Sequence, residues 1–90
     1  MKYWVYALWS ESHDKIYVGF TNNLERRLSQ HANGESTYTR KFRPWQCFFT
    51  EMASTKEEAL KKETYYKSGW GRRRLQKELE EWQSGRMRQS

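Results

Sequence analysis

Two short runs of aromatic and β-branched residues, separated by a polar segment, open the sequence. The runs occupy 3–9 and 15–20, and the segment between them reads Ser-Glu-Ser-His-Asp. Aromatic and β-branched residues are typical of strands, and a short polar connection between two such runs is typical of a hairpin turn. The sequence therefore predicts a β-hairpin over 3–20.

The second of these runs has two different faces. Side chains alternate between faces along a strand, so Ile16, Val18 and Phe20 share one face. Tyr17 and Gly19 share the other face. The apolar face is the one expected to meet the protein core.

Capping and stop signals divide the middle of the chain. Polar side chains at 21–23 offer N-caps for a helix over 23–33, which Gly34 ends. A polar, basic loop is expected over 35–44, and a third strand over 45–52.

Two further helices are predicted in the last part of the chain. Thr55 and Glu58 match a capping box, which predicts a helix that runs to Ser68 and is halted by Gly69. Large apolar residues at helical spacing predict a last helix over 71–82. The expected element order is β-β-α-β-α-α.

Length and charge limit the class of protein. The chain has 90 residues, which fits one small domain with a thin core, and we expect that domain to span 1–83. The polar stretch 84–90 is expected to be a flexible, basic tail. Lys and Arg number 17 against 11 Asp and Glu, a net charge of +6. A small basic domain attracts polyanions such as nucleic acids, although an ordinary solvated surface can carry the same charge.

Cysteine content and hydropathy bear on location. The single cysteine, Cys47, excludes a disulfide framework and a cysteine-based zinc site, and we expect it to be a small buried apolar residue. The sequence has no apolar run of the roughly 18 residues that a membrane helix needs. It also begins without a secretory signal pattern. These features favour a reducing compartment, and we expect a cytoplasmic protein.

The first predicted helix has a polar component on its inward face. Leu24, Arg27, Leu28 and His31 lie on one face at helical spacing. Removing an arginine from water costs free energy unless an anionic partner is present. Arg27 is therefore a candidate residue for binding an anion. The alternative is an arginine that extends to solvent at the edge of the stripe, beside a boundary histidine.

The second predicted helix places a carboxylate on its inward stripe. Ala59 and Leu60 are expected to point inward, and Glu63 shares their face. Mg²⁺ commonly takes one or two carboxylates together with waters and substrate phosphates, so Glu63 is a candidate Mg²⁺ ligand. The alternative is a surface carboxylate paired with Lys67 four residues later.

Two strand tyrosines form a third candidate element. If the hairpin register is roughly symmetric, Tyr6 and Tyr17 face each other across it. A phenol has a pKa near 10 and acts as a base only where a neighbouring cation or metal-bound water lowers that value. The alternative is a pair of ordinary sheet tyrosines.

Taken together and in order, these residues resemble the GIY-YIG nuclease superfamily. The likeness covers about 3–82 and is closest to the small stand-alone GIY-YIG proteins of bacteria. It implies a small twisted three-stranded antiparallel sheet flanked by helices, an α/β fold of the α+β type. The elements that carry it are Val5-Tyr6, Tyr17-Val18-Gly19, Thr21-x-x-Leu24-x-x-Arg27-x-x-x-His31, Tyr38-Thr39-Arg40-Lys41 and the stretch from Glu58 to Glu63.

The resemblance also implies an activity, the hydrolysis of DNA phosphodiester bonds with Mg²⁺ or Mn²⁺ as cofactor. Arg27 would hold a non-bridging phosphate oxygen, and Glu63 would bind the metal. Tyr6 is the first choice for the residue that orients or deprotonates the attacking water. Tyr17 or His31 would position the phosphate or assist proton transfer, and Gly19 matches the signature glycine.

Basic residues form two groups that are expected to follow a phosphate backbone. The alternative for both groups is a solvated surface. Trp70 is expected to fill the turn between the last two helices rather than to stack on a base. The residues expected to contact nucleic acid are Arg40, Lys41, Arg43, Lys67, Arg72 and Arg73.

The chain departs from the family pattern in three places. Trp4 replaces a small residue, Phe20 stands where several members have a lysine, and no asparagine follows Asn33. These departures support a second hypothesis, a catalytically weak or inactive nucleic-acid-binding module on the same fold. A third is a subunit of a larger complex, since one small domain carries no second DNA-binding unit. The leading hypothesis is a DNA endonuclease of repair, recombination or processing.

Overall fold

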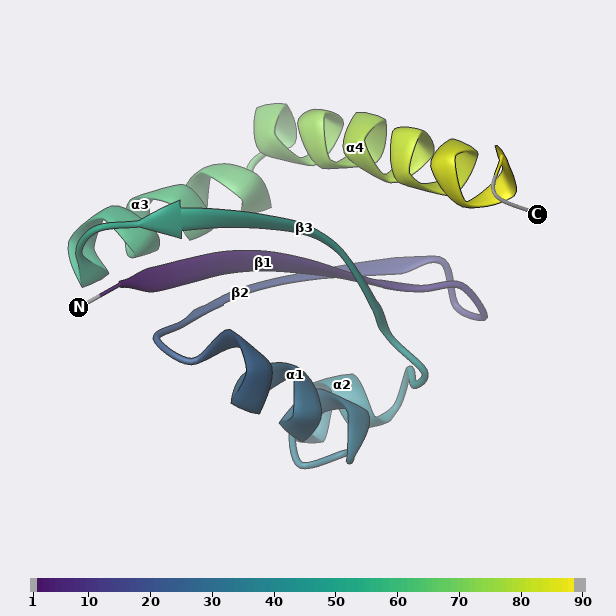
Figure 1. Ribbon diagram of the computed structural model, residues 1–90, viewed down its shortest axis with the longest axis horizontal. Helices are drawn as coiled ribbons and strands as arrows, with labels where there is room; N and C mark the ends of the chain where they lie inside the picture. The colour runs from purple at the N-terminus through teal and green to yellow at the C-terminus, as the bar shows by residue number, and fades with distance from the viewer. Residues whose placement is uncertain (1, 89–90) are drawn as a thin grey trace.

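A computed structural model describes residues 2–88, which form one sheet with helices on both sides (Figure 1). The strands pair antiparallel in the order β2-β1-β3. This confirms the predicted three-stranded sheet flanked by helices. The elements are β1 (Tyr3–Ser10), β2 (Lys15–Thr21), α1 (Leu24–Ala32), α2 (Thr37–Arg40), β3 (Gln46–Ala53), α3 (Lys56–Lys67) and α4 (Gly69–Arg88).

The two faces of the sheet carry different helices. In Figure 1, α3 and α4 lie above the sheet, and α1 and α2 lie below it. The main core lies on the α3–α4 side, because alternate residues of β1 point toward these helices. The buried members of that core are Val5, Ala7, Trp9, Val18, Phe48, Ala53, Ala59, Tyr66, Leu75 and Leu79. The opposite face of β1, which carries Tyr6, is left for α1 and α2.

The hairpin register corrects one expectation about the tyrosines. Tyr6 pairs with Gly19, and Tyr17 pairs with Leu8. The two tyrosines are therefore diagonal neighbours on the same face, with ring centroids 6.3 Å apart, and are not directly opposite each other. This register leaves the space above Gly19 to the Tyr6 ring.

The predicted caps are present, with small differences in detail. Asn23 caps α1 through a side-chain oxygen that accepts from the Arg26 amide at 3.1 Å. Gly34 follows α1 with a φ of 77°, the left-handed conformation that favours glycine. The Thr55 hydroxyl caps α3 by accepting from the Glu58 amide at 3.1 Å. The Glu58 carboxylate in return accepts from Ser54, one residue earlier than the usual capping box.

The C-terminal region is more helical than expected. The last helix, α4, begins at Gly69 and continues to Arg88, although the sequence predicts 71–82. Residues 84–88 of the expected flexible tail are thus helical, and 89–90 lie outside the described residues. Within the expected loop 35–44, Thr37–Arg40 forms one helical turn, α2.

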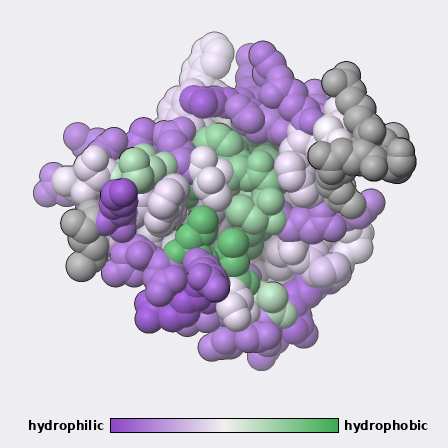
Figure 2. All heavy atoms as spheres, in the orientation of Figure 1, coloured by the Kyte–Doolittle hydropathy of each residue, from purple (hydrophilic) through white to green (hydrophobic). Residues whose placement is uncertain are grey.

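The surface combines a hydrophilic rim with an apolar centre on the face seen in Figure 2. The strand β3 crosses this region in Figure 1 and is one edge of the sheet.

Leu60, which the sequence predicts to point inward, is 42% exposed, because α3 turns it away from the core that Ala59 joins. Among residues 2–88, no helix combines the length and the apolar composition needed to cross a bilayer.

Candidate active site

Tyr6 lies at the centre of a buried polar cluster that joins β1 to α1. Its hydroxyl is 2.8 Å from His31 Nε2 and accepts from Arg27 Nε at 3.3 Å. Tyr6 and His31 are each 1% exposed. The structure therefore brings together three of the five predicted catalytic residues through direct hydrogen bonds.

Gly19 leaves the space that Tyr6 fills. A Cβ at this position would lie 2.7 Å from the Tyr6 hydroxyl oxygen and 3.2 Å from a ring carbon of Tyr17. Any side chain would thus displace the Tyr6 ring from the cluster. This contact gives the signature glycine a physical reason in this chain.

His31 is held on both sides of its ring. Its Nδ1 lies 2.8 Å from the Thr39 hydroxyl, and Thr39 is fully buried. The Trp45 indole fixes the same segment by donating to the Thr39 carbonyl at 2.6 Å. Burial, with a smaller effect from the charge of Arg27, lowers the pKa of His31 to about 4. The imidazole is consequently neutral at neutral pH.

Arg27 is held by neutral partners. Its Nη1 donates to Gln30 Oε1 at 3.0 Å, in addition to the bond from Nε to Tyr6. The bond to the phenol is the main reason that the pKa of Arg27 is raised. A guanidinium has five N–H donors, and these two partners use two of them without neutralising its charge. The site therefore has the cation that an anionic substrate requires.

The phenol of Tyr6 is protonated at neutral pH. Burial is the main cause that raises its pKa to about 12, the neighbouring Tyr17 adds to the increase, and the charge of Glu63 has the smallest effect. The hydrogen bond from Arg27 acts in the opposite direction but is the smaller effect. Tyr6 is thus suited to orient a water molecule, and direct deprotonation by a free phenolate is disfavoured.

Glu63 comes from α3, which packs against β2 and β1. Its side chain is 19% exposed, and its carboxylate lies 3.8 Å from Lys67 Nζ. The predicted ion pair with Lys67 is thus present, but Lys67 is 52% exposed and such a pair is weak. Glu63 therefore remains available as a ligand.

The residues present fit a metal site that the substrate completes. Among the described residues, no three His, Cys, Asp or Glu side chains are grouped so as to hold a metal ion by themselves. Mg²⁺ retains several waters and commonly binds one or two carboxylates together with substrate phosphates. Glu63 is one partly exposed carboxylate of the kind that can hold such an ion.

Tyr17 belongs to an aromatic wall beside the cluster. Its ring centroid lies 5.2 Å from that of His31, 6.0 Å from Tyr38 and 6.3 Å from Trp45. Tyr17 therefore lies at the edge of the site, between the buried His31 and the half-exposed Tyr38.

The predicted basic residues do not share one surface. Arg43 Nη1 donates to the Ala32 carbonyl at 3.4 Å, at the end of α1. In α4, Arg72 lines a cleft with Tyr38, whereas Arg73 lies 5.4 Å from the Trp70 ring. The predicted nucleic-acid contacts of these residues, and those of Arg40 and Lys41, which are exposed, remain predictions.

Trp70 overturns the prediction that it fills the turn before α4. It is 74% exposed. The backbone at Gly71 instead packs directly against the end of α3, so closely that a Cβ there would overlap the Tyr65 carbonyl oxygen. The close approach of the two helices leaves no room for the indole inside.

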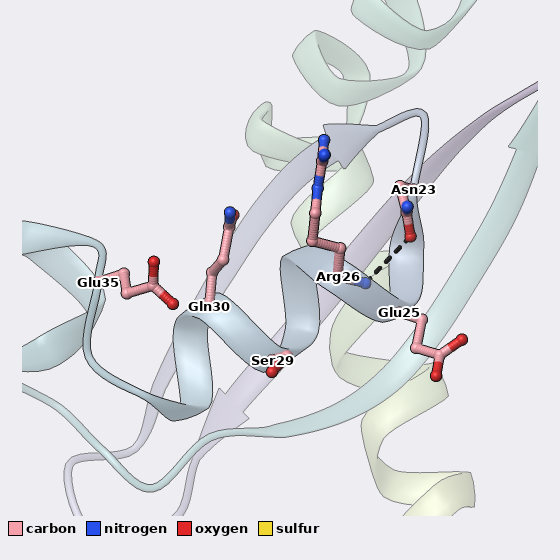
Figure 3. Close-up of a pocket in the computed structure, with 6 residues that line it drawn as sticks. All are labelled: Asn23, Glu25, Arg26, Ser29, Gln30 and Glu35. Carbon is pink, nitrogen blue, oxygen red and sulfur yellow. Dashed lines mark hydrogen bonds between the residues drawn. The ribbon is translucent and has the colours of Figure 1, made fainter.

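A second hollow lies on the outer side of α1 (Figure 3). The N-cap bond to Arg26 lies at one end of it. None of the five predicted catalytic residues is among its described lining residues, which are Asn23, Glu25, Arg26, Ser29, Gln30 and Glu35. Two lining residues connect it to the cluster, because Gln30 accepts from the Arg27 side chain and the Asn23 carbonyl accepts from the Arg27 amide.

The fold and the Tyr6 cluster define a GIY-YIG domain, and comparison with known families agrees. Residues 2–77 match the family described as the GIY-YIG catalytic domain. The chain therefore belongs to the GIY-YIG family, whose domain is that of a nuclease superfamily.

Similar proteins occur among small bacterial proteins named UPF0213. A UPF0213 protein of Bacillus pumilus is 37% identical over 67 residues, 73% of this chain and 67% of the relative. One of Staphylococcus haemolyticus is 33% identical over 89% of this chain and 96% of the relative. One of Bacillus licheniformis is 43% identical, but the match spans 55% of its length. These names assign no activity.

A solved structure has the same fold. The solution NMR structure of a UPF0213 protein from Bacillus halodurans superposes with a TM-score of 0.52 at 32% sequence identity. The match covers 83% of this chain and 82% of that chain. The order of strands and helices described above is thus shared with a protein of the same family.

Proposed function

We propose that the chain is a metal-dependent endonuclease that hydrolyses phosphodiester bonds in DNA, in repair, recombination or processing. The observation that carries this proposal is the buried cluster in which Arg27 and His31 meet on the hydroxyl of Tyr6. The charge of Glu63 acts on the same hydroxyl, because it contributes to the raised pKa of Tyr6. A cation, a hydroxyl and an imidazole thus meet at one point, and the carboxylate of Glu63, on α3, acts on that point only through its charge.

Arg27 would bind the scissile phosphate. Tyr6 and Gln30 fix the guanidinium from two sides, so its orientation is set before substrate arrives. A guanidinium donates two parallel hydrogen bonds to phosphate oxygens and stabilises the negative charge that grows during attack.

Tyr6 and His31 would control the attacking water. The Tyr6 oxygen would accept a hydrogen bond from the water and take the proton that the water loses, while Tyr6 passes its own proton to His31 Nε2, 2.8 Å away. This transfer requires a neutral His31 in the tautomer whose Nδ1 donates to Thr39, so that Nε2 is the accepting nitrogen. The lowered pKa of His31 supplies the neutral state, and the tautomer is part of the proposal.

Glu63 would hold the cofactor. When bound, Mg²⁺ or Mn²⁺ would supply positive charge that offsets the negative charge developing on the phosphate and the leaving oxygen. Because Glu63 is not grouped with two further metal-binding side chains among the described residues, binding of the metal would depend on the substrate phosphate.

The direct test is a cleavage assay on labelled single-stranded, duplex and branched DNA with Mg²⁺ or Mn²⁺ at low salt. We expect cleavage by the natural chain, and a loss of at least about a hundredfold in Arg27→Ala. Equal cleavage by both proteins would contradict the proposal, because the activity would then not come from this site.

The second candidate is a nucleic-acid-binding module without turnover. The raised pKa of Tyr6 and the presence of Phe20 in place of a lysine favour it. It predicts salt-dependent DNA binding with no strand scission under either metal. The same assay separates the two, since binding without cleavage supports only this candidate.

A further inference from the structure

A cleft of about 330 Å³ opens along the free edge of β2, outside the Tyr6 cluster. It is bounded by the start of β2, by α2 from one side of the sheet and by α4 from the other. This volume lies at the lower end of the range of small-molecule sites. The described lining residues are Asp14, Lys15, Ile16, Tyr38, Arg72 and Gln76.

The cleft is connected to the candidate active site by aromatic rings. Tyr17 lies 5.2 Å from His31 on one side and 6.0 Å from Tyr38 on the other, measured between ring centroids. Tyr38 is 51% exposed, so part of its ring faces solvent. A nucleic-acid strand that leaves the active site past Tyr17 would reach the Tyr38 ring next.

The charged groups of the cleft favour an anion. Arg72 and Lys15 are both exposed cations at its border. The single carboxylate, Asp14, accepts a hydrogen bond from the Trp9 indole at 3.3 Å. The neighbouring arginines lie against other rings, since Arg73 is 5.4 Å from the Trp70 ring and Arg74 is 5.8 Å from the Tyr66 ring.

We propose that this cleft binds one unpaired nucleotide of the substrate strand, adjacent to the scissile phosphate. The base stacks on Tyr38, and its phosphate is bound by Arg72. The inference that the nucleotide lies next to the scissile phosphate rests on the proposed function. Binding of the nucleotide in the cleft does not itself require cleavage.

The size of the cleft is the reason that the nucleotide is unpaired. Paired bases in a duplex stack on their neighbours, and their faces are not available to an aromatic side chain. Single-stranded nucleic acid, in contrast, is commonly bound by aromatic rings beside a positively charged groove. A cleft of this volume takes a single nucleotide and excludes a base pair.

The test measures binding in EDTA, where no cleavage occurs, with labelled oligothymidine and a matched duplex. We expect Tyr38→Ala to weaken binding of the single strand by about tenfold, within the range of one lost stacking contact. Tyr38→Phe retains the ring and is expected to bind within about twofold of the natural chain. Affinity for the duplex is expected to change less than about twofold in both variants.

Arg72→Ala gives an independent readout. We expect the slope of log affinity against log salt to decrease in magnitude by about 0.7 for the single strand, the effect of one lost phosphate contact. Lys56→Ala is the matched control, because Lys56 is an exposed cation at the start of α3, at the opposite end of the molecule from the hairpin turn (Figure 1). It is expected to leave the slope unchanged.

Two results would overturn the proposal. One is an unchanged single-strand affinity in Tyr38→Ala, and the other is an equal loss for single strand and duplex. If these binding effects are found but no DNA is cleaved with metal, the proposal that the cleft binds a nucleotide is supported and the endonuclease proposal fails. If cleavage depends on Arg27 but these binding effects are absent, the endonuclease proposal is supported and the cleft proposal fails.

Discussion

Thr39 shows what the sequence could not reveal about the site. Arg27 and His31 could be singled out because each is an unusual residue on an inward helix face, and Tyr6 because it matches the family pattern. Thr39 is an ordinary residue in a polar segment, and its bond to His31 depends on how α2 folds back against α1. Gln30 was missed for the same reason, since a helix glutamine gives no pattern until Arg27 is seen beside it.

Thr39→Val is predicted to impair cleavage more than DNA binding. Valine has nearly the same shape but leaves His31 Nδ1 without its partner, so the ring no longer presents one fixed nitrogen to Tyr6. We expect at least about a tenfold fall in cleavage rate, with affinity for DNA within about twofold. Thr39→Ser keeps the hydroxyl and should restore the rate and its pH profile. A Thr39→Val protein with the natural pH profile would show that Thr39 has only a structural role.

His31 is predicted to make stability depend on pH. Its pKa falls from the ordinary value of 6.5 to about 4 in the folded chain, so the unfolded chain binds the extra proton first. The free energy of unfolding should be greatest above pH 6.5 and should fall by about 3 kcal/mol as the pH decreases toward 4. Urea unfolding at several pH values measures this. The difference from His31→Gln isolates this contribution, and parallel curves for both proteins would contradict it.

At the level of elements, the three strands and the helices α1, α3 and α4 were predictable because each has a local signal. Aromatic and β-branched runs on either side of a polar segment identified the hairpin, and the signals at Gly34 and Thr55 marked the end of α1 and the start of α3. The helix α2 was missed because four residues are too few for an apolar period to show. The start of α4 was misplaced because Gly69 and Gly71 read as helix breakers, whereas the structure places both inside the helix.

The corner between α3 and α4 is predicted to depend on Gly71 and not on Gly69. A Cβ at Gly71 would overlap the Tyr65 carbonyl oxygen, whereas a Cβ at Gly69 would meet nothing within 4 Å. Gly71→Ala should therefore destabilise the chain by about 2 kcal/mol, because backbone must move. Gly69→Ala should stabilise it slightly, by about 0.5 kcal/mol, since alanine favours a helix. Thermal unfolding compares the two, and similar melting temperatures would refute this explanation of the corner.

At the scale of the whole molecule, the candidate site is built from elements on both faces of the sheet. Tyr6 and Tyr17 come from the hairpin, Arg27 and His31 from α1, and Glu63 from α3 across the sheet. The family likeness gave these residues in sequence, and the structure joins the first four through hydrogen bonds or ring contacts. The sequence could not show which basic residues lie on which surface, because that depends on how α4 is rotated against the sheet.

The most direct test of the endonuclease proposal is the single-turnover rate of DNA cleavage in Glu63→Gln, with Glu57→Gln as control. Both changes remove one carboxylate charge from α3, but Glu57 lies in the first turn, is exposed and is outside the site. We predict a fall of at least about a hundredfold for Glu63→Gln and less than about twofold for Glu57→Gln, since only Glu63 would hold the metal. Equal rates in the natural chain and Glu63→Gln would contradict the proposed mechanism.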